Sequence, residues 1–543
     1  MKDVSIDYSK GKFLVQTPPQ LASVARMIPN RRWDGRNRIW RANNIRGNRE
    51  YLKRVFQRDN FTDLAWEEVN AIIERKPLKD FPHSYEFKGT PYKHQLDALN
   101  KINSLDAYAL FMEQGLGKSF TTINDLCNRY NNNLIDAVLV VCPMSIRGNW
   151  QREVEKFATV PSLALPLVTK SAKKDLDQLW DFDGLKWYIV AVESLSSGKA
   201  PEIAEKFLLH TRPAMVVDES STIKNHKANR TKTTISLGKM AKVRAILTGT
   251  PVANGLHDLF SQFEFIDSEI IGLGDFYSFR NRYCIMGGYE NRQVIGYTNT
   301  EELMELIAEN TFQATKAEAL DLPDKIYQRR EIEPSPDQKD LFRAIKQQLI
   351  AEVDGDRVKI DNILEKLLRL QQITAGFFTD EEGDMKMLSS APKIKELMQV
   401  IDETGGQVII WCVFRKEIEM VAEALSKVGT VVEFHGGVSE EQRNENIKLF
   451  QEGKARFFIA NPAAGGMGIT LTAANTVIYM SNSFSYTDRA QSEDRAHRIG
   501  QEKHVTYIDI VMKGSVDELV QKALHSKQDV AGYVRDNIST LTA

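Results

Sequence analysis

The chain has 543 residues, of which 42% are hydrophobic and 27% charged, and its 71 Lys and Arg nearly balance its 73 Asp and Glu. This composition is typical of a globular protein and excludes disordered, collagen-like and membrane proteins, because no run approaches the ~18 apolar residues that span a bilayer. At about 150 residues per domain, the length predicts three or four domains.

The N-terminal residues and the cysteines bear on the cellular compartment. The start, MKDVSIDYSKGKF, lacks the apolar core of a signal peptide, so we expect an intracellular, cytoplasmic protein with no membrane partner. No pair among the four cysteines has the spacing of a zinc site, so we expect buried thiols and no zinc. The cysteines are Cys127, Cys142, Cys284 and Cys412.

The first 60 residues carry most of the positive charge. They hold fourteen Lys and Arg against five Asp and Glu, a net charge of +9, whereas the remainder has a net charge of -11. A basic segment on an acidic body predicts a polyanionic partner, nucleic acid first, although charge alone is equally consistent with a solvated basic surface. Within an expected small domain over residues 1–75, RRWDGRNRIW predicts a β-hairpin, because Asp34-Gly35 supplies the positive φ angles of a tight turn.

The hydrophobic pattern from residue 80 to about 325 predicts an α/β domain. Short apolar runs, namely AYALFM, AVLVVC, YIVAV, AMVVD and RAILTG, alternate with amphipathic stretches. Apolar strands separated by helices are typical of a parallel sheet that is covered on both faces.

A second α/β domain is expected over residues 391–543. Its apolar runs are QVIIWCVF, TVVEFH, ARFFIA, NTVIYM and VTYIDIV, each followed by a helical or turn segment. Residues 326–390 have a charged, helical pattern with no buried strand, which predicts a helical insert or connector. The predicted fold class is therefore α/β, with two parallel-sheet domains, helical inserts and a small basic N-terminal domain.

The segment AYALFMEQGLGKS carries the first chemical signal. A buried strand runs into Gly115, Gly117, Lys118 and Ser119, and a helix follows. Backbone N–H groups of such a loop wrap a phosphate, the lysine reaches the β- and γ-phosphates, and the serine hydroxyl binds Mg²⁺. Met112 occupies the position of the first glycine in the full pattern, so a chance glycine turn is the alternative.

The second signal, AMVVDESSTIKN, lies one hundred positions further along the chain. The strand ends in Asp218, which could hold Mg²⁺, and Glu219, which could polarise an attacking water. A solvated turn after a strand is the alternative interpretation, and the pairing with GLGKS disfavours it.

The third signal is QSEDRAHRIGQ. Gln491, Arg495 and Arg498 fall at i, i+4 and i+7, so a helix would present all three on one face. Two guanidiniums can clamp a γ-phosphate and stabilise the charge that develops during its transfer. A surface Arg–Glu helix is the alternative if the motif is taken alone.

Together and in this order, the three signals resemble the motif set of a superfamily-two helicase core, and their details resemble the Swi/Snf family of ATP-dependent DNA translocases. The resemblance covers roughly residues 85–530 and includes YKHQLDAL, VLVVCPMSIRGNW, LTGTPVANGLHDLFSQFEFI, EFHGG, NPAAGGMGITLTAANTVIYM and RAHRIGQ. It implies two tandem RecA-like lobes that use ATP and Mg²⁺. One departure is that Ser220 and Ser221 follow the carboxylates, where the family usually has a DEAH-like box.

The resemblance also implies roles for individual residues. ATP would contact Tyr92, Gln95, Gly115, Gly117, Lys118, Ser119 and Gly468, and Mg²⁺ would contact Ser119 and Asp218. Catalysis would use Lys118, Asp218, Glu219, Gln491, Arg495 and Arg498. DNA would contact Pro143, Ser145, Thr248, Thr250, Trp411, His435 and Thr470, and Thr248 with Thr250 would relay the nucleotide state to the DNA.

The first 60 residues resemble the basic HARP-type module of annealing translocases, which adds Arg36 and Arg38 as DNA contacts. Aromatic faces can stack on exposed bases while arginines neutralise phosphates. The alternative is that Trp33 and Trp40 form the core of the small domain.

The function implied by the resemblance is an ATP-driven motor on double-stranded DNA that remodels branched DNA by branch migration, fork reversal or strand annealing, as DNA repair and recombination require. We expect double-stranded and branched DNA as partners and a monomeric protein. A strand-separating helicase is the alternative within the same class. A nucleotide-gated DNA-binding scaffold without turnover is the alternative from another class, but it would lack Lys118, Glu219 or the arginines, and all are present.

Overall fold

The computed structural model describes the chain except for residues 1–3, 30, 71–85, 253–254, 288–292, 320–322, 354–359, 380–383, 463–468, 499, 527–529 and 531–543. The chain folds as two compact units, Met1–Thr315 and Lys316–Ala543. Among the helices of the described ranges, none is both long enough and apolar enough to cross a bilayer.

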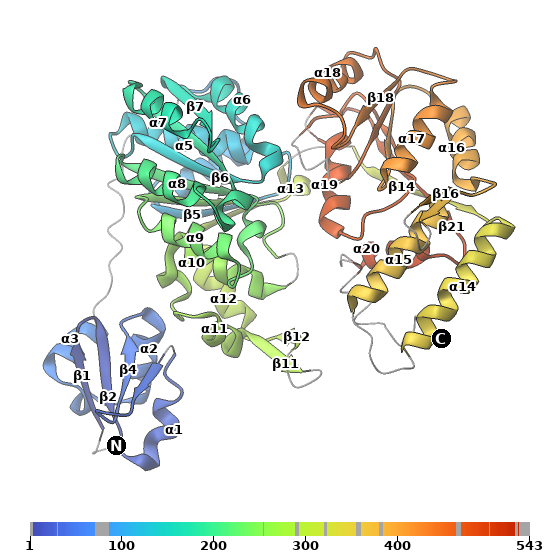
Figure 1. Ribbon diagram of the computed structural model, residues 1–543. Coiled ribbons are helices and arrows are strands. Elements are labelled where there is room, and N and C mark those ends of the chain that lie inside the picture. The colour runs from blue at the N-terminus through green and yellow to red at the C-terminus, as the bar shows by residue number, and fades with distance from the viewer. Residues whose placement is uncertain are drawn as a thin grey trace. The chain divides into compact units, whose positions relative to one another are not determined.

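The first unit begins with a small domain built on an antiparallel sheet, drawn in blue in Figure 1. The strands lie in the order β1-β2-β4-β3, and alternate residues such as Ile6, Phe13 and Val15 share a buried core with Leu52 of α2 and with Phe56, which follows that helix. The elements are β1 (Ser5–Ser9), β2 (Lys12–Gln16), α1 (Ala22–Ala25), β3 (Arg31–Asp34), β4 (Ile39–Asn43), α2 (Arg46–Val55) and α3 (Asp63–Asn70).

The predicted hairpin forms, but its turn is longer than predicted. Asp34 pairs with Ile39, so residues 35–38 form the loop, and the positive φ angle of 52° falls on Arg38 rather than on Asp34 or Gly35. The Asp34 carboxylate accepts hydrogen bonds from the backbone N–H groups of Arg36 and Asn37 and from the Asn37 amide, which stabilises this wider turn. The prediction of a tight turn at Asp34-Gly35 is therefore wrong.

The first lobe, residues 86–315, is built on a seven-stranded parallel sheet in the order β13-β5-β10-β9-β6-β8-β7. Every residue of β5, β6 and β9 is buried, as their apolar runs predict. The strands are β5 (Ala107–Met112), β6 (Ala137–Cys142), β7 (Ser162–Pro166), β8 (Leu185–Ala191), β9 (Pro213–Asp218), β10 (Val243–Leu247) and β13 (Thr311–Ala314), and a separate hairpin pairs β11 (Cys284–Gly287) with β12 (Gln293–Tyr297).

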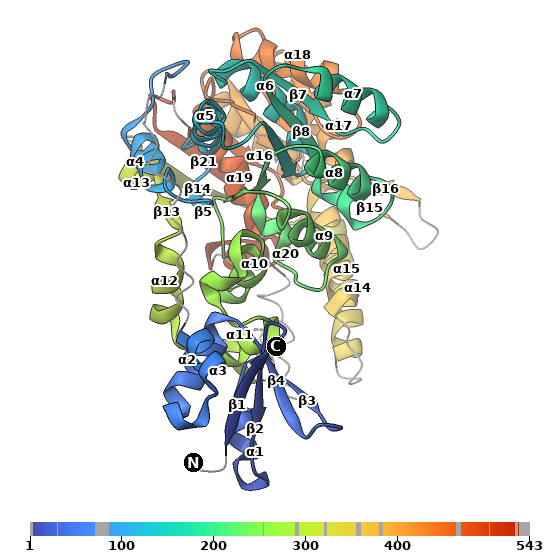
Figure 2. The ribbon, with the colours of Figure 1, turned by 90° about the vertical axis from the view of Figure 1, so that its left-hand side faces the viewer.

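Helices cover both faces of this sheet (Figures 1 and 2). Residues from α7 to α10 and α12 share one large core with alternate strand residues such as Ala109 and Leu139. Helices α4, α5 and α6 pack against one another and against β13, β7 and β8. The helices are α4 (Lys93–Ile102), α5 (Lys118–Asn131), α6 (Arg147–Phe157), α7 (Ala172–Asp181), α8 (Ala200–Leu209), α9 (Asn229–Gly238), α10 (Leu259–Ile271), α11 (Phe276–Tyr283) and α12 (Thr300–Ala308).

The second unit contains a six-stranded parallel sheet in the order β14-β21-β20-β17-β19-β18. The five apolar runs predicted as strands all lie in it, so the prediction of two parallel-sheet α/β domains is confirmed. Its strands are β14 (Lys325–Ile332), β17 (Val408–Trp411), β18 (Val431–Phe434), β19 (Phe457–Ala460), β20 (Thr476–Tyr479) and β21 (Val505–Met512), and β15 (Phe377–Thr379) pairs with β16 (Met385–Met387). The helices are α13 (Lys316–Ala319), α14 (Pro336–Val353), α15 (Ile360–Ala375), α16 (Pro392–Glu403), α17 (Arg415–Leu425), α18 (Glu440–Gln451), α19 (Tyr486–Ala496) and α20 (Val516–His525).

One strand of the second sheet is not predicted by the sequence pattern. β14 lies in the segment expected to be purely helical and pairs with β21 along its whole length. Half of its side chains are charged, most are exposed, and only Ile332 is buried, because β14 is an edge strand. An edge strand lacks the continuous apolar run by which buried strands are identified. The helical pattern of the rest of this segment corresponds to α14 and α15.

Candidate active site

The loop between β5 and α5 has the backbone geometry of a phosphate-binding loop. Gly115 and Gly117 have φ angles of 86° and 82°, and α5 begins directly afterwards at Lys118. A Cβ atom on Gly117 would lie 2.2 Å from Nε2 of Gln95, so both the backbone conformation and the close approach require glycine. The first N–H groups of a helix have no intrahelical acceptor, and they therefore suit an anion.

Lys118 folds back over this loop. Its Nζ donates hydrogen bonds to the carbonyl oxygens of Met112 at 2.9 Å and Glu113 at 3.4 Å, and the neighbouring Ser119 is partly exposed. An entering phosphate can replace these neutral acceptors, because a charged acceptor binds an ammonium group more strongly.

Two predicted ATP contacts, Tyr92 and Gln95, lie at the start of α4, and Gln95 contacts the same loop. Gln95 is 4% exposed, its Oε1 accepts a hydrogen bond from the backbone N–H of Tyr92 at 3.0 Å, and its Nε2 donates to the carbonyl of Leu116 at 3.1 Å. Gln95 therefore braces the phosphate loop, and its predicted role in reading adenine stays a prediction. Tyr92 is 43% exposed, so it offers a ring surface to a ligand.

The acidic pair lies at the carboxyl end of β9, at the same edge of the sheet. Leu247 of β10 pairs with both Leu110 of β5 and Asp218, so the loops that follow these strands are neighbours. Gln114 of the phosphate loop donates a hydrogen bond to Oε1 of Glu219 at 3.3 Å. The structure thus brings Lys118 and the two carboxylates of the first lobe together, as predicted.

Asp218 is buried and hydrogen-bonded. Burial raises the pKa of Asp218, while the charge of Lys118, the indole N–H of Trp150 and the backbone N–H of Glu219 lower it. Glu219 has a left-handed backbone with a φ angle of 50°, which turns its side chain away from the direction of the strand. The two carboxylates therefore differ in surroundings, because Asp218 is enclosed and Glu219 is partly exposed.

A buried hydrogen-bond chain links the acidic pair to the TGTP loop. Ser220 donates from Oγ to Oε1 of Gln262 at 2.6 Å, and Gln262 donates from Nε2 to the carbonyls of Pro251 and Asp258 at 2.9 and 3.0 Å. Ser220 and Gln262 are fully buried. In the sequence Ser220 is recognisable only as a departure from the family pattern, and no local signal indicates Gln262, which lies 42 positions away.

The predicted DNA-contacting residues of the first lobe lie in loops that follow β6 and β10. Ser145 is exposed, and Pro143 and Thr250 are partly exposed. Thr248 is fully buried and its Oγ1 accepts the backbone N–H of Thr250 at 3.1 Å. The Thr248 side chain is therefore enclosed and supports Thr250 rather than offering DNA a side-chain contact, and the predicted relay through Thr248 and Thr250 stays a prediction.

In the second lobe, the predicted arginine helix ends earlier than expected. α19 ends at Ala496, so Gln491 and Arg495 lie on the helix and Arg498 lies beyond it. The carbonyl of Ala496 accepts a hydrogen bond from the Gln501 side-chain amide at 3.2 Å. The prediction that all three share a helix face is wrong. Arg498 instead donates from Nη1 to Oγ1 of Thr470 at 3.2 Å, which brings together two of the predicted residues.

The other predicted residues of the second lobe have different surroundings. His435 is partly exposed and contacts Oε2 of Glu433 at 3.1 Å. Trp411, on the central strand β17, is 0% exposed in the hydrophobic core of the second lobe. Its side chain has no surface that could contact DNA, so the prediction of a DNA contact by this side chain is wrong. Gly468 lies outside the described residues.

In the N-terminal domain, Arg36 and Arg38 are exposed in the β3–β4 loop. Trp33 pairs across the strands with Trp40, with ring centroids 4.8 Å apart, and Trp33 is 46% exposed whereas Trp40 packs against the small core. One tryptophan therefore has a core role and the other presents a ring to solvent. Asp34 pairs with Arg41, and the Asn37 hydrogen bonds lower the pKa of Asp34 to about 2.

The N-terminal domain contacts the first lobe through the start of α2. The Glu269 carboxylate accepts a hydrogen bond from the backbone N–H of Arg46 at 3.1 Å and pairs with Arg49 at 3.1 Å. The backbone N–H of Gly47 donates to the carbonyl of Gly272 at 2.8 Å, and a Cβ atom on Gly47 would lie 2.5 Å from that oxygen. A carboxylate from the lobe thus caps a helix of the small domain.

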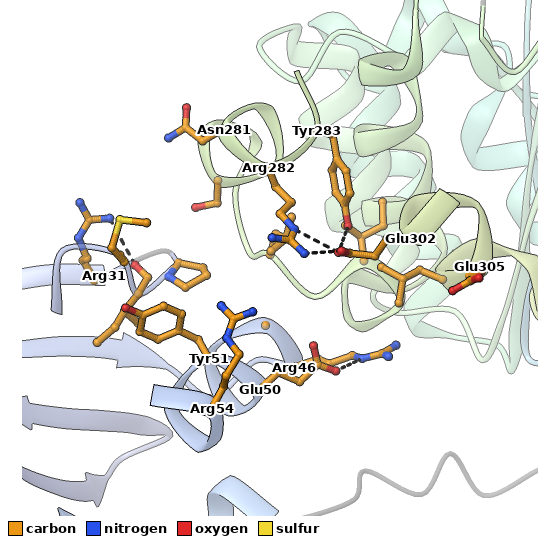
Figure 3. A pocket seen from close by; sticks show the side chains of 18 of the residues that line it. Arg31, Arg46, Glu50, Tyr51, Arg54, Asn281, Arg282, Tyr283, Glu302 and Glu305 are labelled. Carbon is orange, nitrogen blue, oxygen red and sulfur yellow. Dashed lines mark hydrogen bonds and ion pairs between the residues drawn. The ribbon is translucent and has the colours of Figure 1, made fainter. Parts of the chain in front are cut away.

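A cavity of about 880 Å³ lies beside this contact (Figure 3). Arg31 and Arg54 come from the small domain, whereas Glu302 and Glu305 come from α12, and Arg282 of α11 pairs with Glu302. Because both charge signs line the cavity, it does not have the uniform positive charge that suits a phosphate backbone.

The donor set at the edge of the first sheet fits Mg²⁺. Mg²⁺ prefers oxygen ligands and binds through one or two carboxylates together with substrate phosphates. Asp218 accepts one hydrogen bond on each carboxylate oxygen, from Trp150 and Glu219, which leaves a lone pair on both, and the Ser119 hydroxyl follows the phosphate loop directly. Asp218 and Ser119 would therefore hold the ion, as predicted.

The fold and this arrangement are those of a two-lobed parallel α/β protein with a phosphate-loop site on its first lobe. The chain belongs to the family defined by the SNF2-related domain, which matches residues 94–376, more than half of the chain. The Helicase conserved C-terminal domain matches residues 392–500.

Similar proteins have been described in bacteria, plants and archaea. YwqA of Bacillus subtilis (strain 168), whose name describes an ATP-dependent helicase/translocase, is 28% identical over 497 residues, which cover 87% of this chain and 52% of YwqA. The CHD3-type chromatin-remodeling factor CHR7 of Arabidopsis thaliana is 26% identical over 486 residues, which cover 83% of this chain and 38% of CHR7. The chain thus spans about half or less of the length of these relatives.

A solved structure is also similar. The Sulfolobus solfataricus SWI2/SNF2 ATPase core in complex with dsDNA is 24% identical and has a TM-score of 0.40, with 85% of this chain and 95% of that chain covered.

Proposed function

We propose that this chain is a DNA-dependent ATPase that translocates on double-stranded DNA and remodels branched DNA. The observation that carries the proposal is the meeting of a phosphate loop and an acidic pair at one sheet edge, joined by the hydrogen bond from Gln114 to Glu219. Membership of the SNF2-related family and the ATP-dependent helicase names of relatives support it.

In this proposal different residues bind the phosphates, position the attacking water and stabilise the transition state of ATP hydrolysis. The N–H groups at the start of α5 bind phosphate oxygens, and Lys118 neutralises the β- and γ-phosphates. Glu219, which is partly exposed, orients the attacking water and accepts its proton. Mg²⁺ would neutralise charge on the phosphates from its place at Asp218 and Ser119. Arg495 and Arg498 of the second lobe stabilise the charge of the transition state.

The proposed role of the N-terminal domain is the choice of DNA structure. A phosphate track looks alike along a duplex, so preference for a junction has to come from other contacts. The net charge of +9 in residues 1–60, exposed Arg36 and Arg38, and the exposed ring of Trp33 support such contacts. Under this proposal the domain is a HARP-like module, and the chain would serve DNA repair or recombination.

ATP hydrolysis with and without DNA tests the enzymatic part. Duplex DNA should stimulate hydrolysis, Lys118→Ala should abolish turnover, and Glu219→Gln should bind ATP but barely hydrolyse it. Wild-type-like turnover in either variant would contradict the assigned roles. Exposed Lys173→Ala, on α7, is a control that should hydrolyse ATP normally.

Two strand-displacement assays test the motor activity. A translocase should displace the third strand of a triplex in an ATP-dependent manner and fail to open a simple forked duplex. The β11–β12 hairpin favours a second candidate, a strand-separating helicase, because its exposed Ile285 and Ile295 could divide two strands. Efficient fork unwinding without triplex displacement would favour that helicase.

A further inference from the structure

A long stretch after the acidic pair contains only positive charge. Between Glu219 and Asp258 the sequence has seven Lys and Arg and no Asp or Glu. Two of the lysines, Lys227 and Lys232, are exposed at and near the start of α9. The motifs that define the ATP site do not use this charge.

Aromatic contacts join this stretch to α11. The His226 ring stacks on Phe276 with centroids 3.8 Å apart and meets the edge of Tyr277, and the Arg280 guanidinium lies 5.3 Å from the centroid of the Tyr277 ring. Burial lowers the pKa of His226, and the charges of Lys227, Lys232 and Arg280 lower it further. These three cations therefore act on one imidazole, and we call Lys227, Lys232 and Arg280 the α11 surface.

The β11–β12 hairpin follows α11 directly and projects from the lobe (Figure 1). Ile285 is 46% exposed on one strand and Ile295 is 64% exposed on the other. Both aliphatic side chains are therefore accessible to a partner.

The base of the hairpin is attached to the segment that follows the TGTP loop. The Tyr297 hydroxyl lies 3.0 Å from Nδ1 of His257, and the two rings stack at 6.3 Å. Gly255 has a φ angle of 146°, and a Cβ atom there would lie 1.6 Å from the Tyr297 hydroxyl. Only glycine fits, so the hairpin and the segment after Thr250 are in direct contact.

We propose that the α11 surface and the hairpin together form a second contact with duplex DNA on the first lobe, and that Tyr297 couples this contact to the TGTP loop. This inference rests on the proposed function as a DNA-dependent ATPase. The cations would neutralise phosphates, and Ile285 and Ile295 would enter the minor groove, where aliphatic side chains act as wedges.

The side chains of this surface fit a duplex better than a single strand. Sites for single strands use aromatic rings as platforms for bases. In the described part of the hairpin the exposed apolar side chains, Ile285 and Ile295, are aliphatic, and the Tyr277 ring, although 54% exposed, is in contact with Arg280 and His226.

The salt dependence of duplex binding tests the cations. The slope of log K against log salt is negative, and each lost phosphate contact reduces its magnitude by about 0.9. The triple variant Lys227→Ala, Lys232→Ala, Arg280→Ala should therefore reduce the magnitude by about 2.7. The matched control, Lys170→Ala, Lys173→Ala, Lys174→Ala, removes three exposed charges near α7, at the other end of the lobe, and should keep the wild-type slope (Figures 1 and 2). An unchanged slope in the first triple variant would overturn the proposal.

The same salt series tests the hairpin. The double variant Ile285→Ser, Ile295→Ser should weaken duplex binding roughly tenfold without changing the salt slope. It loses apolar burial but keeps every phosphate contact. A loss confined to single-stranded DNA would identify a single strand as the occupant and overturn the duplex assignment.

Tyr297→Phe tests the coupling, because it removes only the hydroxyl. Duplex affinity and basal hydrolysis should stay at the wild-type level, while stimulation of kcat by DNA should fall several-fold. Unchanged stimulation would overturn the coupling role. A wild-type protein that DNA does not stimulate would contradict the proposed function itself, whereas normal stimulation with an unchanged salt slope would contradict only this inference.

Discussion

The indole Nε1 of Trp150 donates a hydrogen bond of 2.8 Å to Oδ2 of Asp218, and the two residues are 1% and 8% exposed. Trp150 lies on α6, in the segment VLVVCPMSIRGNW that also holds the predicted DNA contacts Pro143 and Ser145, whereas Asp218 is the predicted Mg²⁺ ligand. The bond therefore joins the candidate DNA-binding segment to the candidate metal site. It also stabilises a buried carboxylate whose pKa burial raises.

Trp150→Phe should move the acid limb of the pH profile of kcat/KM to higher pH. The variant keeps an aromatic ring but removes the donor, so the pKa of Asp218 should rise further and its ionised form, which binds Mg²⁺, should be scarcer at a given pH. The apparent Mg²⁺ affinity should fall, and stability should fall by about 1–3 kcal/mol. Trp187→Phe is the control, because Trp187 is equally buried and its Nε1 has no hydrogen-bond partner among the described residues. An acid limb at the wild-type pH would show that the bond does not tune Asp218.

Ser220→Ala and Gln262→Leu should each lower DNA-stimulated kcat about tenfold while leaving the KM for ATP unchanged. Each variant breaks the buried hydrogen-bond chain between Ser220, next to Glu219, and the TGTP loop, which is not among the predicted ATP contacts. Because both residues belong to one hydrogen-bond chain, the double variant should be no worse than the more severe single variant. Ser261→Ala, which loses a hydrogen bond to Lys224 instead, is the control. Additive losses would contradict a shared route.

Arg495→Ala or Arg498→Ala should lower kcat roughly 10³-fold with little change in ATP affinity, because an arginine finger acts mainly on the transition state. Thr470→Val removes the acceptor that positions Arg498 and should have a smaller effect in the same direction. Arg415→Ala, at a side chain that is 70% exposed, should be neutral. Steady-state kinetics at saturating DNA would distinguish these outcomes, and a loss of ATP affinity alone would contradict the finger role.

Deleting residues 1–75 should preserve ATP hydrolysis on plain duplex and erase any advantage of forks or four-way junctions. Charge reversal of Arg36 and Arg38 should do the same without unfolding the small domain, because both side chains are exposed. Reversal of Lys10 and Lys12 changes the charge equally at the β1–β2 turn and should keep the preference. An unchanged junction preference in the truncated protein would place recognition in the lobes.

Glu417→Gln should flatten the pH dependence of stability in the second lobe. Burial raises the pKa of Glu417 from 4.5 to about 7, against the charge of Lys393 and the hydrogen bond from Ser481. The folded state therefore binds more protons than the unfolded state between these values, so the contribution is full below pH 4.5 and is lost as pH rises to about 7. The wild type should lose about 3 kcal/mol over this range in denaturant unfolding, and the variant should not. Glu419→Gln, at an exposed ion pair with Lys416, should behave like the wild type.

The sequence by itself determined the buried strands and the phosphate loop, because these features depend only on residues that are adjacent in the chain. Apolar runs such as those of β5, β6 and β9 indicate buried strands directly, because parallel strands covered on both faces contain few polar residues. The phosphate loop is equally local. Gly115 and Gly117 fix the positive φ angles, and Lys118 begins the next helix, so the motif carries its own geometry.

The tertiary structure decided which distant residues meet and which side chains are enclosed. The bond from Trp150 to Asp218 joins positions 68 apart, and that from Ser220 to Gln262 joins positions 42 apart, so no local pattern indicates either. The same packing buries Trp411 and leaves β14 at a sheet edge. Contacts of this kind follow from the order of the strands and the packing of helices on the sheets, which many residues set jointly and no single motif encodes.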